Sequence, residues 1–517
     1  MKKTYFGICL YIIFSFNGSL LYGQMNSINK KIIDLKQEYS TPTLSKAQMY
    51  QDFDSLYNIF KFCNPQIVVR KQITGIDILS ELKALRNEID IIKNPEDFII
   101  LLYRALRLSY DPHCQIGTSI WYYRNSIYKK EAKKYSNNFF ACTFHYRDII
   151  NRNIIEFLHL QYIEGQYYLT NPLILYKTND SINIPVRSII KKINGQSINE
   201  YIQRNLDIQW DLRWDFIRKC YYVNSISSYS NYQLLSLEYI FNNKSCIVDS
   251  ISKFRQQISS FDFTNYVEAK TVKYFSKDSI LYIRCPLMNT SDIGFYKKEI
   301  AKFKGSPLEK VIVDIRGNWG GDDEVWMTIL KQIINIPIEN KIVYLSSNST
   351  LLSHYTKSKG FKPNKKTIVP NWDTTTIYKI VSEKPEIIKP SKSSLKFEGN
   401  IYIMQDEDIY SAAGSLSAMA SYNYKIINVG RSNDKLGGRG IEPMSFGLPN
   451  SKMIFVMNIL IDNTNVNTAK DIYHNDIKIP VFLPIDYYID RNNYPENVYS
   501  ETYLYNYDEF FKQVMKM

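Results

Sequence analysis

The sequence predicts an α/β protein, in which a helical segment and a strand-rich region precede a parallel sheet. Residues 401–404 are an apolar run of strand length, a polar loop follows, and apolar residues after 411 recur at near-helical spacing. A second apolar run at 425–429 ends in a glycine. This order of strand, loop, helix and strand is the unit from which parallel sheets are built.

The same unit occurs earlier in the chain with a glycine-rich junction. Residues 311–315 predict a strand, residues 314–321 read DIRGNWGG, and a helix is expected over 323–334. The adjacent glycines Gly320 and Gly321 would present N–H groups suited to a phosphate or an oxyanion. A phosphate site is disfavoured because neither the P-loop nor the dinucleotide-binding pattern is present. A tight turn that merely needs glycine remains open.

Length and pattern divide the chain into four segments. A chain of 517 residues is too long for one ordinary core. Residues 1–24 have two lysines, an apolar core and then small residues, which predicts a secretory signal. Residues 25–120 predict helices, 121–272 short strands, and 273–517 the α/β domain. We therefore expect an exported protein, periplasmic or extracellular, with no membrane span after the signal is removed.

Composition excludes some classes of protein. Apolar residues make up 45% of the chain and aromatic residues 14%, which excludes a disordered protein. The net charge of +13 is spread along the chain without a nucleic-acid-binding motif, so nucleic acid is not an expected partner. The oligomeric state stays open. No pair of cysteines has the spacing of a zinc site. We expect mostly buried thiols, with one disulfide possible, among Cys63, Cys114, Cys142, Cys220, Cys246 and Cys285.

His113 is the first histidine, and it follows three expected helices within residues 44–109. The last of these helices starts after Asn94, and Pro112 stops any continuation. Histidine titrates near neutral pH, so His113 is a candidate general base, or else a turn residue satisfied by Asp111. Cys114 is discounted as its partner because neighbours on an extended segment point to opposite faces.

The middle region shows short apolar and aromatic runs that predict strands, for example 139–146, 154–162 and 166–169. A strand over 188–193, the Asn194-Gly195 turn and a helix from Ser197 resemble a segment of PDZ domains, which bind peptides at a sheet edge. Farther on, the polar stretch from about 336 to 395 predicts loops over the sheet, and 453–461 predicts a strand.

Ser411 lies where a loop enters the helix that follows residue 411. Unpaired amide N–H groups and the positive end of the helix dipole favour negative charge there. The serine is therefore a candidate nucleophile whose oxyanion backbone amides would hold. On this stretch alone an N-cap serine is the favoured interpretation, because serine is among the commonest N-caps.

Several of these stretches together resemble one family, the C-terminal processing (tail-specific) serine peptidases, including the tricorn core. VIVDIRGNWGG resembles its D-x-R-x-N-x-G-G loop, IYSAAG its nucleophile segment, and LPNS at 448–451 a downstream motif. DPH at 111–113 resembles the D-x-H segment of the tricorn-like branch.

The resemblance implies a ClpP/crotonase-like catalytic domain behind a PDZ-like middle domain, acting on peptides without metal or cofactor. It implies Ser411 as nucleophile and His113 as general base. Backbone amides of Gly320 or Gly321, together with that of Ala412, would form the oxyanion hole.

The sequence departs from the family pattern in two places. Arg439 stands near where the Ser–Lys branch has its lysine, and arginine is a poor base, which leaves Lys435 as a weak substitute. Pro112 stands where the tricorn-like branch has a serine that orients the histidine. Glu442 and Asp471 are the candidates for that orienting role.

Two other functions stay open on the same scaffold. One is a non-catalytic protein that holds a peptide or an apolar ligand, which the Pro112 departure motivates. The other is a crotonase-type hydrolase or isomerase, ranked last because the chain has an export signal and no evident coenzyme A pocket.

Overall fold

The computed structural model describes residues 41–117, 137–178, 180–256, 270–350, 352, 365–369, 373–382, 385–495 and 497–517. The secretory signal predicted for residues 1–24 lies outside these ranges. Among the described helices, none is both long enough and apolar enough to cross a membrane.

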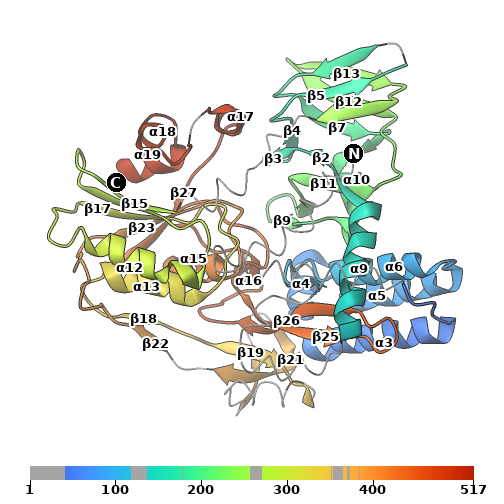
Figure 1. The fold of residues 1–517 in the computed structure, drawn as a ribbon, viewed down its shortest axis with the longest axis horizontal. Coiled ribbons are helices and arrows are strands. Elements are labelled where there is room, and N and C mark those ends of the chain that lie inside the picture. Colours follow the sequence, from blue (N-terminus) through green and yellow to red (C-terminus); the bar gives the residue numbers. More distant parts are fainter. Residues whose placement is uncertain are drawn as a thin grey trace.

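The α/β domain is built on a six-stranded sheet with helices on both faces (Figure 1). Its strands, in spatial order, are β15 (Thr271–Phe275), β16 (Ile280–Arg284), β17 (Lys310–Asp314), β23 (Ile401–Gln405), β24 (Ile426–Gly430) and β27 (Ile479–Pro480). All neighbours pair in parallel except β15, which is antiparallel to β16. The predicted parallel sheet is thus confirmed, with each predicted strand within one residue of its observed bounds.

Side-chain alternation along β17 shows why its sequence is apolar throughout. Val311 and Val313 pack against α12 (Ile293–Ala301), α13 (Asp323–Ile333) and α15 (Ala412–Tyr422). Ile312 points to the other face, where the C-terminal helices pack. A strand covered on both faces has no polar side, so it appears as a continuous hydrophobic run. The helices on that second face are α17 (Ile485–Asn493), α18 (Glu501–Asn506) and α19 (Glu509–Met515).

A second, antiparallel sheet lies beside the first and corrects one prediction. Its strands run in the order β1 (Gln115–Ile116), β26 (Ile454–Asp462), β19 (Tyr344–Ser347), β21 (Asp373–Ser382) and β20 (Lys365–Val369), and β25 (Gly440–Gly447) also pairs with β26. The prediction of loops for 336–395 was wrong, because this stretch supplies β19, β20 and β21, as well as the paired β18 (Ile338–Asn340) and β22 (Glu386–Ile388). An antiparallel sheet can leave one face to solvent, so its strands can be polar enough to resemble loops.

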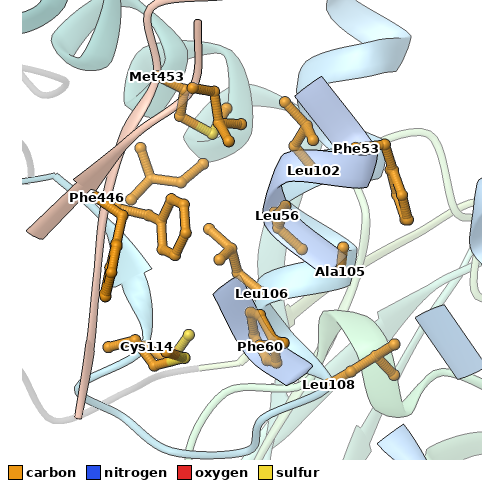
Figure 2. Close-up of a cluster of buried hydrophobic side chains, with 14 of the residues drawn as sticks. Phe53, Leu56, Phe60, Leu102, Ala105, Leu106, Leu108, Cys114, Phe446 and Met453 are labelled. Atoms are coloured by element: carbon orange, nitrogen blue, oxygen red, sulfur yellow. The ribbon is translucent and has the colours of Figure 1, made fainter. Parts of the chain in front are cut away.

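The helices of residues 46–107 pack onto this second sheet (Figure 2). Phe53, Leu56 and Phe60 of α3 (Lys46–Cys63) meet α6 (Pro95–Arg107) in one buried cluster with Phe446 of β25 and Met453 before β26. Asn94 caps α6 as predicted, by accepting a hydrogen bond from the Asp97 N–H at 2.9 Å. In chain order, α3 and α6 are separated by α4 (Ile67–Thr74), α5 (Ile78–Asn87) and a 3₁₀ turn at Glu88–Ile91.

The described part of the middle region begins with a helix where a strand was predicted. Residues 139–146 belong to α9 (Asn137–Asn153), whose Cys142, Tyr146, Ile149 and Ile150 join the core around α3 and α6. Their spacing is helical, and packing against that core outweighs the strand preference of the aromatic residues between them. The strand prediction for 139–146 was therefore wrong.

The other described residues of the middle region are rich in strands, as predicted. β7 (Ile189–Ile193) is followed by a turn with positive φ at Asn194 (49°) and Gly195 (78°), and then by α10 (Ile198–Arg204). Ser197 caps α10 in a capping box with Glu200. Around it lie β2 (Ile154–His159), β3 (Gln161–Ile163), β4 (Gln166–Tyr168), β5 (Leu173–Tyr176), β6 (Ser181–Ile184), β8 (Gln196–Ser197), β9 (Arg213–Asp215), β10 (Cys220–Tyr222), β11 (Ser225–Tyr229), β12 (Ser236–Phe241), β13 (Lys244–Asp249) and β14 (Lys253–Gln256).

The six cysteines that follow the predicted signal all lie in the described part of the chain, and none of them is joined in a disulfide. Four are buried, as the sequence led us to expect. The fold therefore rests on packing and hydrogen bonding.

Candidate active site

His113 reaches the α/β domain through strand pairing. Directly after it, β1 pairs antiparallel with β26, with Gln115 opposite Val456 and Ile116 opposite Phe455. Continuing this register by two residues brings His113 opposite Asn458, and paired residues face the same side of a sheet. Cys114 points to the opposite side, into the core of Figure 2.

Ser411 sits at the entrance of α15 in a strained backbone conformation. Its φ is 53° and its ψ is −124°, values that an L-residue with a side chain rarely adopts. The Ser411 side chain caps no N–H of α15, so the simple N-cap interpretation does not describe it. A serine held on a sharp, strained turn into a helix is also how α/β-hydrolases expose their nucleophile.

The two residues meet although 298 positions separate them. Nε2 of His113 lies 3.3 Å from Oγ of Ser411. The side chain of His113 is 18% exposed, so the pair is accessible from solvent. This is the nucleophile-and-base geometry that a serine hydrolase requires, at the slightly loose distance typical of a site without substrate.

A buried hydrogen-bond network fixes the other side of the imidazole. Nδ1 of His113 lies 2.6 Å from the Tyr410 hydroxyl, which donates to Oδ1 of Asp111 at 2.5 Å. Nδ2 of Asn458 is 2.8 Å from the same Nδ1 and donates to Oδ2 of Asp111 at 2.6 Å. The His113 N–H also donates to Asp111, at 2.9 Å. Asp111 thus orients the ring largely through a hydroxyl, since its own Oδ1 is 3.5 Å from Nδ1.

The charge of Asp111 is maintained despite its burial. Burial raises the pKa of this carboxyl, but the His113 ring and the hydrogen bonds from Tyr410 and the His113 amide lower it further, so the net pKa is below its ordinary value. Burial, followed by the nearby Asp111 charge, holds the pKa of Tyr410 well above its ordinary value. The network is therefore a carboxylate and a neutral phenol at neutral pH, which suits a histidine that must accept a proton.

The glycine loop approaches the nucleophile closely. A Cβ on Gly320 would lie 2.5 Å from Cβ of Ser411, and a Cβ on Gly321 would lie 2.1 Å from the Met288 carbonyl oxygen. Only glycine fits either position, and both have positive φ (95° and 134°). The loop is therefore shaped by the contact with Ser411 as well as by the turn.

The predicted oxyanion donors differ in what their N–H groups already bind. The N–H of Gly320 donates to Oδ1 of Asn318 at 2.7 Å, so it is occupied, and Gly320 contributes close approach instead of donation. Asn318 also accepts, at its carbonyl, the Tyr410 N–H at 2.9 Å. Among the described residues, the N–H groups of Gly321 and Ala412 have no acceptor. Ala412 is the first residue of α15, where amides lack helical acceptors.

A buried ion network supports the glycine loop from behind. Arg316 binds Asp314 through two nitrogens, at 3.0 and 2.6 Å, and Asp508 of the C-terminal region at 2.5 Å. All three residues are at most 1% exposed. Burial raises the pKa of Asp314, but Arg316 and Arg284 lower it further, so its net pKa falls below the ordinary value. The D-x-R part of the loop sequence is thus a structural brace.

Asp406 ties the glycine loop to the loop that carries Ser411. Its Oδ1 accepts the N–H of Gly317 at 2.7 Å and that of Asp408 at 3.1 Å. Burial, together with the charges of Asp408 and Glu407, raises the pKa of Asp406 to about 6. The two loops are therefore held by a carboxyl in an environment that disfavours its charge.

The structure gives other partners to the remaining candidates. Asp471 accepts the N–H groups of Asn467 (2.7 Å) and Thr468 (2.9 Å), so its carboxylate organises a local turn and is not part of the network at His113. Glu442 lies on β25 with φ 53°, near enough to Tyr344 for its charge to raise the pKa of that tyrosine. The positions predicted for them beside the histidine are filled by Asp111, Tyr410 and Asn458.

The two cations considered as substitutes for a catalytic lysine are also engaged. Lys435 is buried and forms an ion pair with Asp211, while Arg439 binds Asp462 at 3.2 Å and the Thr464 carbonyl at 2.9 Å. Burial, opposed by Asp211, lowers the pKa of Lys435. Burial raises the pKa of Cys114 to about 12, so this thiol is not a nucleophile at neutral pH.

Two residues of the site were not predicted as functional, although each left a signal. Asn458 is a polar residue inside the otherwise apolar run IFVMNILI, and a buried polar residue there needs a partner. Tyr410 directly precedes Ser411 in the segment IYSAAG, and this adjacency to the candidate nucleophile is its signal. Among the described residues, no group of three or more histidine, cysteine, aspartate or glutamate side chains could hold a metal ion.

Comparison with known proteins gives a family for the α/β domain. Residues 279–465 match the model of peptidase family S41. These residues include Ser411 and the glycine loop, but not His113. A search of curated proteins gives no match.

The fold resembles solved structures of mature CPAF. One structure is 11% identical, covers 92% of this chain and 98% of its own, and has a TM-score of 0.55. A complex of mature CPAF with lactacystin is 11% identical, covers 91% and 98%, and also has a TM-score of 0.55. A CPAF mutant is 12% identical, covers 89% and 97%, and has a TM-score of 0.50. At these identities the likeness concerns the fold.

The backbone of Ser411 yields a stability prediction. Replacing Ser411 by glycine should relieve its strain, so Ser411→Gly should exceed Ser411→Ala in unfolding free energy by about 1–2 kcal/mol. Urea unfolding of the two variants measures this difference. Ser421 in α15 is the control, because at a helical position alanine should be favoured over glycine by about 1 kcal/mol. A less stable glycine variant at 411 would contradict the assigned strain.

The raised pKa of Asp406 predicts a pH dependence. Between about pH 4, where the unfolded carboxyl titrates, and pH 6, the folded state binds the extra proton, so this group's contribution to stability falls as pH rises. Asp406→Asn keeps the accepting oxygen and removes the charge. Its stability relative to wild type should therefore increase from pH 4 to pH 7, by about 1–3 kcal/mol. Urea midpoints measured at each pH check this, with exposed Glu324→Gln as control, and a pH-independent difference would refute it.

Proposed function

Because this chain belongs to peptidase family S41, a family of serine-type peptidases, we propose that it hydrolyses peptide bonds with Ser411 as nucleophile and His113 as general base. The observation that carries the proposal is the 3.3 Å contact between these two side chains. It is supported by the Asp111 network behind the histidine and by the glycine loop beside the serine.

The acylation step follows from these positions. Oγ of Ser411 attacks the scissile carbonyl carbon while its proton passes to Nε2 of His113. The tetrahedral intermediate carries its negative charge on the former carbonyl oxygen. When it collapses, the C–N bond breaks, His113 returns the proton to the leaving amine, and an acyl ester on Ser411 remains. Water activated by the same histidine then hydrolyses this ester.

The oxyanion would be held by the N–H groups of Gly321 and Ala412. The Gly321 amide belongs to the glycine loop and the Ala412 amide to the first turn of α15, and neither N–H has an acceptor among the described residues. Loss of one such donor typically costs about 2.7–4 kcal/mol of transition-state stabilisation. Gly320 lets the loop approach, and its own N–H stays with Asn318.

Asp111, Tyr410 and Asn458 would act as positioning residues for His113. If Nδ1 carries the proton, it donates to the Tyr410 oxygen, and Tyr410 in turn donates to Asp111. The positive charge that develops on the imidazole is then compensated by a carboxylate one hydroxyl away. This arrangement would orient His113 in place of the serine that Pro112 replaces, so the Pro112 departure no longer favours the non-catalytic alternative.

An activity-based label tests the proposal. A fluorophosphonate should label the wild-type protein, Ser411→Ala should abolish labelling, and His113→Ala should slow it about 10²- to 10⁴-fold, the usual contribution of a general base. Mass spectrometry of the labelled peptide identifies the modified residue, and Ser415→Ala is the matched control. Labelling that persists in Ser411→Ala would reject the assignment, and a folded wild type that is never labelled would favour a binding protein.

Tyr410→Phe tests the positioning network. This variant keeps the ring but removes the hydroxyl that joins His113 to Asp111, so kcat on labelled casein should fall about 10- to 1,000-fold with little change in KM. Tyr424→Phe, at an exposed position, is the control. An unchanged kcat would exclude Tyr410 from the mechanism.

A further inference from the structure

Trp319 is unusual within the glycine loop because its side chain is partly open to solvent. It is 38% exposed, whereas Asn318 before it is fully buried and Gly320 after it is buried. Tryptophan is a large apolar residue that is normally well covered. An exposed indole on a loop that is otherwise fixed by buried contacts indicates a role in binding.

The indole lies near the catalytic pair, next to Tyr410. Its ring centroid is 6.3 Å from that of Tyr410, and the Tyr410 centroid is 4.6 Å from that of His113. The next residue, Gly320, touches Ser411. Three neighbouring rings therefore connect the general base to Trp319, and Trp319 is the most exposed of them.

The position of the indole is fixed from behind. The ammonium of Lys435 lies over the Trp319 ring, 4.8 Å from its centroid, and over the Tyr410 ring at 5.7 Å. Lys435 is itself fully buried and paired with Asp211 of the middle region. A cation over an aromatic face favours a defined ring orientation. Trp319 is thus held in place on one side while another part of its surface faces solvent.

We propose that Trp319 is a specificity-determining residue, whose exposed indole surface packs against an apolar or aromatic substrate side chain next to the scissile bond. The inference rests on the proposed peptidase function. A peptide acylating Ser411 must pass the glycine loop, because that loop borders the serine. A rigid aromatic surface loses little conformational entropy on binding, so it rewards a large apolar side chain and gives nothing to a small or charged one.

The test compares cleavage preferences. A mixture of peptides of known sequence is digested, and mass spectrometry reports the residues that flank each cut. Wild type should favour leucine, phenylalanine or tyrosine at one position next to the cut. Trp319→Ala should reduce that preference about tenfold or more, which is the scale of one apolar contact. Trp319→Phe should retain most of it, and Phe482→Ala, at another exposed aromatic residue, should retain all of it.

Fluorophosphonate labelling separates this inference from the function on which it rests. The reagent carries no peptide side chain, so its labelling rate in Trp319→Ala and Trp319→Phe should stay within a few-fold of wild type. Normal labelling with an unchanged cleavage preference would overturn the role of Trp319 alone. Labelling lost in both variants would show that the indole maintains the active site instead, which also overturns it. Failure of the wild type to label or cleave would overturn the proposed function and this inference with it.

Discussion

The buried carboxylate of Asp111 is the interaction on which the candidate site depends. It accepts hydrogen bonds from the Tyr410 hydroxyl, the Asn458 amide and the His113 N–H, which come from three separate stretches of the chain. A buried charge is costly unless it is paired or hydrogen-bonded, so these donors and this acceptor require one another. The same contacts that satisfy Asp111 fix the position of the imidazole. The hydrogen bonds that stabilise the fold around Asp111 therefore also set the geometry of the candidate site.

Much of the fold follows from local pattern, because strand–loop–helix units have distinct periodicities. Local pattern predicts the glycine loop and the junction that carries Ser411. It also predicts the helix caps at Asn94 and Ser197. What local pattern does not contain is pairing between distant strands. The register that sets His113 opposite Asn458 links residues 345 positions apart, so the role of Asn458 is invisible until β1 and β26 meet.

The predictions that failed share a physical cause. The aromatic residues of α9 favour a strand, but its packing partners are on α3 and α6, and this packing requires a helix. Asp471 was a plausible carboxylate in the right domain, yet its charge is used by the backbone of its own turn. In both cases tertiary contacts decided an outcome that residue type alone leaves undetermined.

The site also combines rigid support with local strain. Arg316, braced between Asp314 and Asp508, ties the glycine loop to the C-terminal helices, and Asn318 holds both Gly320 and Tyr410. Within these contacts, Ser411 has backbone angles that a residue with a side chain rarely adopts. Strain of this kind persists only where the surroundings over-determine the structure. The C-terminal region therefore supports the glycine loop through the contact between Asp508 and Arg316.

The most direct test of the account is a crystal structure of the protein after reaction with a fluorophosphonate. The account predicts phosphorus on Oγ of Ser411, and a phosphoryl oxygen about 2.7–3.1 Å from the amide nitrogens of Gly321 and Ala412. It also predicts Nε2 of His113 within hydrogen-bond reach of Oγ, with Asp111 still bound to Tyr410 and Asn458. A phosphoryl oxygen directed into solvent, or an imidazole out of reach of the serine, would contradict it.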